Sequence, residues 1–138
     1  VWTNSDAIFA VGDDRMLVFD ENGENTGTLA YGDQNLYSVK YDDKGNIAVC
    51  RTDLGGAKTY ITVYNKDGTK ACEKTFVGTV TDMDIDKNRF AVLKGGTITV
   101  YDLEGEEKET ITTESNATQL LFKSGKCYTV ESGKICKY

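Results

Sequence analysis

Three carboxylates alternate along one short segment of the chain, at Asp82, Asp84 and Asp86. Two carboxylates at a defined separation are the machinery of acid–base catalysis and of glycoside hydrolysis. Asp33 and Asp53 could form another such pair, although the sequence gives no separation for them. Alternation at every second residue is also typical of one face of a half-buried β-strand, or of a strand that contacts a neighbouring repeat. The strand interpretation is favoured.

A second acidic segment, residues 20–25, places carboxylate and amide oxygens at Asp20, Asn22 and Glu24. Such spacing could suggest calcium, but the full loop pattern that ends in a bidentate glutamate is not met. Asp, Asn and Gly are also the usual residues of tight turns. We therefore expect a hairpin turn here and no metal site.

Nucleophilic catalysis is disfavoured because the chain has no histidine to activate a serine or cysteine. The sequence also has no nucleophile-elbow motif and no phosphate-binding glycine loop. We predict no catalytic residues and no cofactor. The balance favours a protein that is not an enzyme.

The four cysteines are Cys50, Cys72, Cys127 and Cys136. Cys127 and Cys136 fall on one hairpin, where Thr129 is expected opposite Cys136. Cys127 is then only a diagonal neighbour, farther away than a disulfide normally allows. Cys50 and Cys72 fall on strands with another strand between them. Free, mostly buried thiols are expected, and the absence of a Cys-x-x-Cys pair argues against zinc.

Composition restricts the partners. Apolar residues make up 39% of the 138 residues and the formal net charge is -6, so a nucleic-acid partner is not expected. No apolar stretch reaches the roughly 18 residues that a membrane span requires, so this segment should not insert into a membrane. The chain starts at Val1 without an initiator methionine, which suggests a processed or excised piece of a longer protein.

A repeat organises the whole chain. A β-rich run ends in an aromatic residue and is followed by Asp or Asn, two further residues and Gly. The aromatic positions are Phe19, Tyr64, Tyr101 and Tyr138, with spacings of 45, 37 and 37 residues. Spacings of this size are typical of four-stranded propeller blades. The last copy is cut short at its aromatic residue.

Each repeat divides into four strands, which we name a, b, c and d in chain order. Alternating apolar residues and turns rich in Gly, Asn and Asp support every strand. The predicted fold class is all-β, a propeller-like arc of about three and a half four-stranded antiparallel blades. The predicted blades are residues 1–34 (incomplete first strand), 35–79, 80–115 and 116–138 (last strand missing).

The four runs around the aromatic positions resemble bacterial β-propeller domains of the WD40-like and quinoprotein-like kind. The nearest likeness is to uncharacterised envelope-associated propellers of Gram-positive bacteria. The Gly-His and Trp-Asp signatures of true WD40 repeats are missing. The aligned tryptophans of quinone-binding propellers are missing too, since Trp2 is the only tryptophan. The resemblance implies a binding or scaffold role and an extracytoplasmic location, with the cytoplasm as the alternative.

A candidate binding face follows from one length difference. The spacing that ends at the second aromatic position, 45 residues, is eight residues longer than the other two, and the excess lies between strands b and c of the second repeat, in residues 51–58. Insertions in repeat proteins tend to map to one face, often the binding face. In propellers the b–c and d–a connections share a face. The predicted ligand-binding residues on it are Tyr31, Asp33, Asp13, Arg15, Arg51 and Asp53. A hairpin extension without a role is the alternative.

The sequence therefore predicts a non-enzymatic recognition or scaffold module that binds a protein, peptide or glycan through loops on one propeller face. A glycan hydrolase or lyase using acidic side chains, or a structural spacer of a larger envelope protein, are the alternatives. An arc of this size also leaves open blade faces. A second copy of the chain, or further blades of a longer parent chain, would complete the ring.

Overall fold

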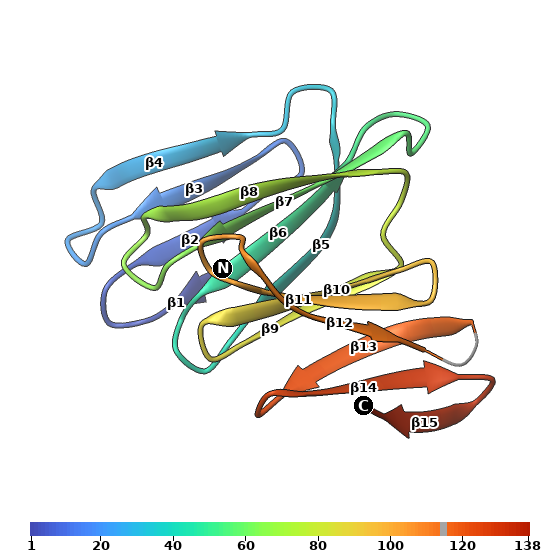
Figure 1. Cartoon of the computed structure of the whole chain (residues 1–138). Helices are drawn as coiled ribbons and strands as arrows, with labels where there is room; N and C mark the ends of the chain where they lie inside the picture. Colours follow the sequence, from blue (N-terminus) through green and yellow to red (C-terminus); the bar gives the residue numbers. More distant parts are fainter. Residues whose placement is uncertain (114–115) are drawn as a thin grey trace.

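The computed structural model describes residues 1–113 and 116–138, which form fifteen strands and no helix (Figure 1). The strands form separate antiparallel sheets in chain order, three of four strands and one of three. No helix in the described residues is long and apolar enough to span a membrane. The predicted fold class, an all-β propeller-like arc, is confirmed.

The first two blades are complete as sheets. Blade 1 contains β1 (Trp2–Thr3), β2 (Ile8–Val11), β3 (Arg15–Phe19) and β4 (Asn25–Ala30). Blade 2 contains β5 (Asn35–Tyr41), β6 (Ile47–Thr52), β7 (Lys58–Tyr64) and β8 (Lys70–Val77). The two-residue β1 pairs with β2, so it is a short strand a.

The last two blades follow the same order. Blade 3 contains β9 (Asp82–Asp86), β10 (Arg89–Lys94), β11 (Thr97–Asp102) and β12 (Glu107–Thr112). Blade 4 contains β13 (Ala117–Lys123), β14 (Lys126–Glu131) and β15 (Lys134–Lys137). Glu114 and Ser115, the end of the predicted third blade, lie outside the described residues. Just before β9, the Val80 N–H donates to the Thr59 hydroxyl of blade 2 at 3.2 Å.

The c–d hairpins show why the repeated glycine is needed. The glycines at Gly23, Gly68 and Gly105 have φ of 79°, 86° and 86°, a region that favours glycine. The aspartate that begins the first of these turns, Asp20, accepts bonds of 2.9 Å from the N–H groups of Asn22 and Glu24. This contact pattern is that of an Asx turn.

The hydrophobic core lies between neighbouring blades. One cluster joins blades 1 and 2, including Phe9 and Ile47; a second joins blades 2 and 3, including Ile61 and Phe90. A third joins blades 3 and 4. Strands b and c pack against the neighbouring blades with both faces. Successive residues along them are therefore buried alternately against the preceding blade and against the following blade. Each blade is thus stabilised mainly by its neighbours.

None of the four cysteines forms a disulfide in the described residues; Cys50 and Cys127 are buried, and Cys72 and Cys136 are half-buried. Burial raises the pKa of Cys50 to about 12 and that of Cys127 to about 11, so both stay protonated at neutral pH. Thr129 pairs with Cys136, which is the predicted hairpin register.

Candidate functional site

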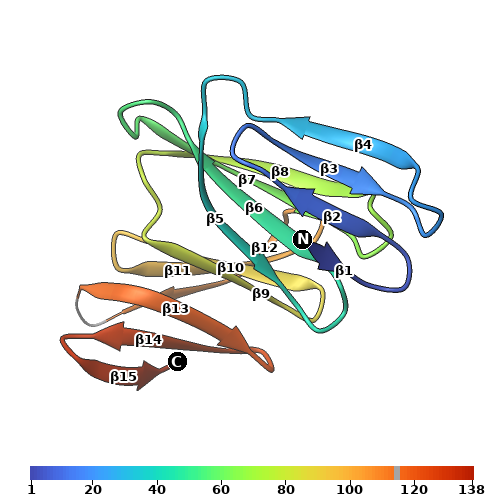
Figure 2. The same ribbon diagram turned by 180° about the vertical axis from the view of Figure 1, so that it is seen from behind.

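The b–c and d–a connections lie on one side of the arc and the a–b and c–d turns on the other (Figures 1 and 2). Four of the predicted site residues lie on the first side. Asp13 and Asp33 are exposed in connections, and Asp53 begins the b–c turn of blade 2, where its Oδ1 accepts a bond from the Lys58 N–H. Arg15 pairs with its neighbour Asp14 at 2.6 Å. Geometry brings none of these four together in one cavity.

The other two predicted residues, Tyr31 and Arg51, lie together in the interior between blades 1 and 2. Only 4% of the Arg51 side chain is exposed, and its guanidinium lies 6.0 Å from the centre of the Tyr31 ring. Arg51 donates to Thr62 at 2.6 Å and to Glu73 at 3.1 Å, and Thr62 also donates to Glu73. Arg51 is therefore a buried, paired charge that fixes strands β6, β7 and β8.

The alternating aspartates of β9 connect blade 3 to blade 4. Asp82 accepts bonds from the Met83 N–H on its own strand at 2.9 Å and from the Leu120 N–H on β13 at 2.8 Å. Asp84 does the same with Ile85 and Phe122. Each of these two carboxylates thus joins edge N–H groups of two neighbouring blades.

Such a role is structural. An edge strand presents unpaired N–H groups, and these aspartates satisfy them. Burial raises the pKa of Asp84, and the two backbone N–H bonds oppose that rise. The carboxylates are spaced along one strand and do not face each other across a cleft, an arrangement that does not suit glycoside hydrolysis. The described residues contain no cluster of three or more groups that could hold a metal.

Between the inner strands β5, β9 and β13 lies a groove of about 630 Å³, here called the axial groove. Its lining includes Tyr37, Ser38 and Lys40 of β5, Asp82 of β9, and Thr118 and Gln119 of β13. Except for Ser38 and Lys40, these residues lie near the starts of their strands. The axial groove therefore adjoins the side that carries the d–a and b–c connections.

Two β-bulges shape the axial groove. The register between β5 and β6 shifts between Leu36 and Ser38, which makes Tyr37 the extra residue; Thr118 is the extra residue on β13. A bulge turns a side chain away from the alternation of its strand. Tyr37 therefore departs from the side of Val39 and Tyr41, which faces blade 1. It donates its hydroxyl to the Thr81 carbonyl at the start of blade 3.

The axial groove is polar and carries charges of both signs. Asp82 and Lys40 line it, and the Lys40 charge lies near enough to Asp84 to oppose the rise in that carboxyl's pKa. The Ser38 hydroxyl is buried without a hydrogen-bond partner among the described residues, and Tyr37 is 47% exposed. The groove thus offers an aromatic ring, the Thr118 hydroxyl, an amide, an ammonium group and a carboxylate to a ligand.

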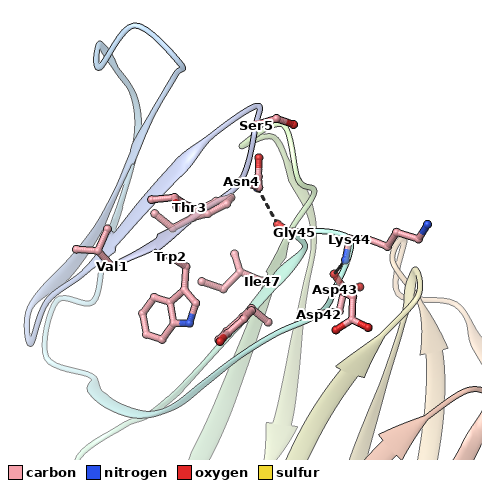
Figure 3. A pocket seen from close by; sticks show the side chains of 12 residues that line it. Val1, Trp2, Thr3, Asn4, Ser5, Asp42, Asp43, Lys44, Gly45 and Ile47 are labelled. Atoms are coloured by element: carbon pink, nitrogen blue, oxygen red, sulfur yellow. Dashed lines mark hydrogen bonds between the residues drawn. The ribbon is translucent and has the colours of Figure 1, made fainter.

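A second hollow, of about 510 Å³, lies between blade 1 and the a–b turn of blade 2 (Figure 3). We call it the aromatic pocket, and Trp2 and Tyr41 line it together with Phe9, Ile47 and Asp43. The Trp2 and Tyr41 rings lie 5.8 Å apart at an angle of 59°. Trp2 projects from β1 toward the second blade.

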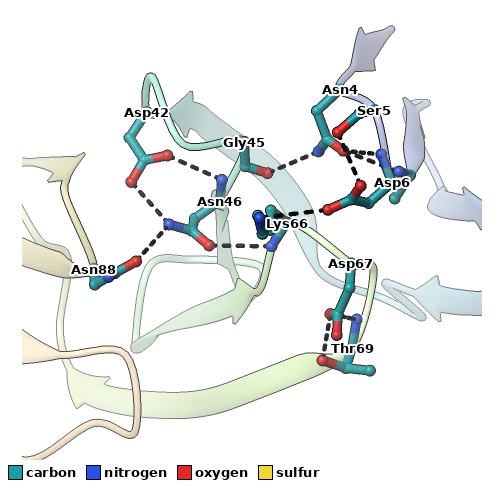
Figure 4. Close-up of polar contacts among 11 residues, drawn as sticks. Asn4, Ser5, Asp6, Asp42, Gly45, Asn46, Lys66, Asp67, Thr69 and Asn88 are labelled. Carbon is teal, nitrogen blue, oxygen red and sulfur yellow. Dashed lines mark hydrogen bonds and ion pairs between the residues drawn. The ribbon is translucent and has the colours of Figure 1, made fainter.

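Polar side chains join neighbouring a–b turns (Figure 4). Asn4 of blade 1 donates to the Gly45 carbonyl of blade 2 at 3.2 Å. Asn46, which is buried, donates to Asp42 at 2.9 Å and to Asn88 of blade 3 at 3.2 Å. The rims of the aromatic pocket are held in place by these bonds.

Sequence reasoning missed the axial groove. Tyr37 and Thr118 fit an ordinary alternating strand, and nothing in the sequence marks a bulge at either. Lys40 is a charged residue on an inner strand and faces the third blade. This position can be recognised only once the order of the strands is known.

A polar groove bounded by the inner strands of successive antiparallel blades defines a β-propeller-like repeat protein. The chain belongs to a family of unknown function (DUF5711), whose model matches residues 1–137. A comparison with curated proteins gives no match.

Solved structures share the fold. A protein of unknown function from Bacteroides caccae is 14% identical, with a TM-score of 0.54 over 99% of this chain and 58% of that one. BamB from Moraxella catarrhalis is 15% identical, with a TM-score of 0.54 over 96% of this chain and 42% of that one. BBS1N in complex with ARL6DN is 13% identical, with a TM-score of 0.62 over 95% of this chain and 45% of that one. This chain thus spans about half the length of these structures.

Proposed function

We propose that the chain is a non-enzymatic recognition module that binds a glycan in the axial groove. The observation that carries this proposal is the bulge that turns Tyr37 toward the groove, since bulges commonly re-aim side chains next to binding sites. About half of the Tyr37 side chain is accessible, so its ring offers an apolar surface to the C–H face of a sugar. Recognition would extend to the b–c and d–a connections, where Asp13, Arg15, Asp33 and Asp53 lie.

The remaining groove chemistry supports a hydroxylated ligand. Thr118 supplies a hydroxyl, and Gln119 supplies an amide that both donates and accepts. Lys40 supplies an ammonium group, whose charge also acts on the nearby Asp84 carboxylate. A glycan unit that bears a carboxylate would satisfy both the hydroxyl groups and this charge.

Catalysis is not part of the proposal. A glycan hydrolase needs a carboxylic acid and a carboxylate on opposite sides of the scissile bond. Both oxygens of Asp82, the carboxylate of the axial groove, already accept backbone N–H groups. We therefore propose binding without turnover. We also propose an extracytoplasmic location, in keeping with the resemblance to envelope-associated propellers.

A protein partner is the second candidate. BBS1N, which shares the fold, was solved in complex with ARL6DN. In this chain, Leu54 at the tip of the b–c turn of blade 2 is 71% exposed and would suit a protein contact on the same side. Leu54→Ala and Tyr37→Ala separate the two candidates, because a protein bound through this turn depends on Leu54 and not on Tyr37.

The test is a glycan array that includes neutral and carboxylate-bearing glycans, followed by titration calorimetry with the best ligand. Tyr37→Ala and Lys40→Ala should each weaken binding about tenfold or more, the effect of losing one contact of roughly 1.4 kcal/mol. Tyr41→Ala is the matched control, since it removes a tyrosine from the opposite side of the same strand and should leave affinity unchanged. Absence of any glycan binding, or equal losses for Tyr37→Ala and Tyr41→Ala, would refute the proposal and favour a spacer or protein-binding role.

A further inference from the structure

We infer that the aromatic pocket is a separate site for an organic cation, that is, a guanidinium or alkylammonium group. Two aromatic rings from different blades form its walls, with Trp2 of β1 and Tyr41 of β5 5.8 Å apart and inclined at 59°. A cation over the face of either ring is attracted by its negative π-surface. The site is distinct from the axial groove, which lies on the other side of β5.

The pocket is a formed cavity with a firm base and rim. Its base contains Phe9 and Ile47, which are 1% and 0% exposed. The Asn4 side chain spans the rim and donates to the Gly45 carbonyl (Figure 3). Gly45 has φ of 92°, and a Cβ atom there would lie 2.6 Å from the Asn4 amide nitrogen. The a–b turns of blades 1 and 2 therefore approach each other so closely that only glycine fits at position 45.

The charge of the molecule favours a cation at this end. Residues 1–34 carry seven carboxylates and one basic side chain, whereas residues 35–138 carry fifteen of each. The whole formal charge of -6 thus resides in blade 1, which supplies Trp2 and one wall of the pocket. On the opposite wall, Asp42 and Asp43 add two carboxylates, of which Asp43 pairs with Lys123 at 3.0 Å, and Lys44 adds an ammonium group. The net negative charge of blade 1 attracts cations toward this end of the molecule.

Tyr41 is 61% exposed, so the pocket is reachable by a side chain of a partner polypeptide or by a small quaternary ammonium compound. Both sources share the chemistry that the rings and carboxylates recognise. The neutral carbon isostere of choline has the same shape without the charge, and it should not bind.

Trp2, the only tryptophan of the chain, reports this site directly. Choline and N-acetylarginine amide, each titrated into the 138-residue chain, should change its fluorescence saturably, with the neutral isostere of choline producing no such change. Tyr41→Leu should weaken binding about tenfold, whereas Tyr41→Phe, which keeps the ring, should change it less than about threefold. Tyr37→Ala, in the axial groove, should have no effect.

The inference is overturned if neither cation produces a saturable change at millimolar concentration, if the neutral isostere binds equally well, or if Tyr41→Leu and Tyr41→Phe behave alike. Thermal unfolding of both variants checks that they remain folded, which is expected because the Tyr41 side chain is mostly exposed. A variant that is folded but gives no fluorescence change has lost binding. Choline and the arginine amide separate the two sources of cation, and saturable binding of either one supports the site. Because Tyr37→Ala affects only the glycan and Tyr41→Leu only the cation, the two sites fail or succeed independently.

Discussion

The Oδ2 atom of Asp84 accepts a 2.8 Å hydrogen bond from the backbone N–H of Phe122, which lies 38 residues farther along the chain. Its Oδ1 atom accepts a bond from the Ile85 N–H of its own strand. One carboxylate therefore joins the inner edges of blades 3 and 4. The carboxylate oxygens accept the backbone N–H bonds that carbonyl oxygens accept inside a sheet.

Asp84→Asn tests this bridge. One end of the amide would present N–H groups to a backbone N–H, so that one buried donor loses its acceptor. The expected loss is about 1–3 kcal/mol of unfolding free energy at neutral pH, measured by urea titration. Asp33→Asn, at an exposed connection, should change stability by less than about 0.5 kcal/mol. Equal effects of the two substitutions would contradict the bridging role.

Blade packing can be measured separately from turn geometry with two glycines at equivalent positions. Gly23 and Gly68 have φ of 79° and 86°, so alanine costs each turn about 1–2 kcal/mol. A Cβ atom at Gly68 would lie 2.7 Å from the Val18 Cγ1 of blade 1, but at Gly23 it would meet open space. Gly68→Ala should therefore destabilise the chain by a further 1–3 kcal/mol or so.

Urea unfolding of the two alanine variants provides this comparison. Equal losses of unfolding free energy in Gly68→Ala and Gly23→Ala would show that the c–d turn of blade 2 does not pack closely against blade 1.

Acid should weaken the contact of Arg51 with Glu73. Burial alone would raise the pKa of Glu73, but the hydrogen bond from Thr62 and the charges of Arg51 and Lys70 outweigh it and hold that pKa below its usual value. Because the folded-state pKa is the lower one, the stabilisation is present above the unfolded pKa, near 4.3, and is lost as the pH falls below it.

The check is urea unfolding of the wild type and of Glu73→Gln at pH 7 and at about pH 3.5. The variant should be the less stable protein at pH 7 and should lose less of its unfolding free energy on acidification. An identical acid loss in both proteins would show that Glu73 does not contribute to it.

Much of this fold is predictable from the sequence because each strand carries its own alternation and each turn its own Gly, Asn or Asp. The hairpin register of Cys136 opposite Thr129 follows from such local rules. The sequence predicts Arg51 in a loop because the insertion begins at it, yet β6 continues to Thr52. Its partner Glu73 comes from β8, and no local pattern links two residues so far apart in sequence.

The candidate site was less predictable. The side of the arc that carries the b–c and d–a connections follows from the repeat, but the axial groove depends on a one-residue bulge at Tyr37. A bulge changes which way a side chain points without changing the composition of the strand. The aromatic pocket likewise depends on how closely blades 1 and 2 approach, which is a property of packing between repeats.

A polypeptide of residues 1–138 should self-associate, because its two end blades expose faces that resemble buried ones. Ile135 of blade 4 is 78% exposed, whereas its counterpart in blade 3, Ile98, is fully buried. Ile135 borders an apolar groove of about 180 Å³ with Leu121 and Val130. We propose head-to-tail contact of this face with the outward face of blade 1 in a second copy, which would close a ring.

Light scattering at low micromolar concentration should give the mass of two copies, and Ile135→Lys should give that of one. A monomeric wild type under these conditions would show that the end faces do not recognise each other.

Nuclear magnetic resonance with a glycan selected on the array shows where on the chain the glycan binds. If it occupies the axial groove, the backbone amide shifts should concentrate at Tyr37, Lys40 and Gln119, and Tyr37→Ala should abolish them at the same glycan concentration. Shifts concentrated instead at Leu54 and the b–c turn of blade 2, or no shifts at a saturating glycan concentration, would show that the groove is not the glycan site.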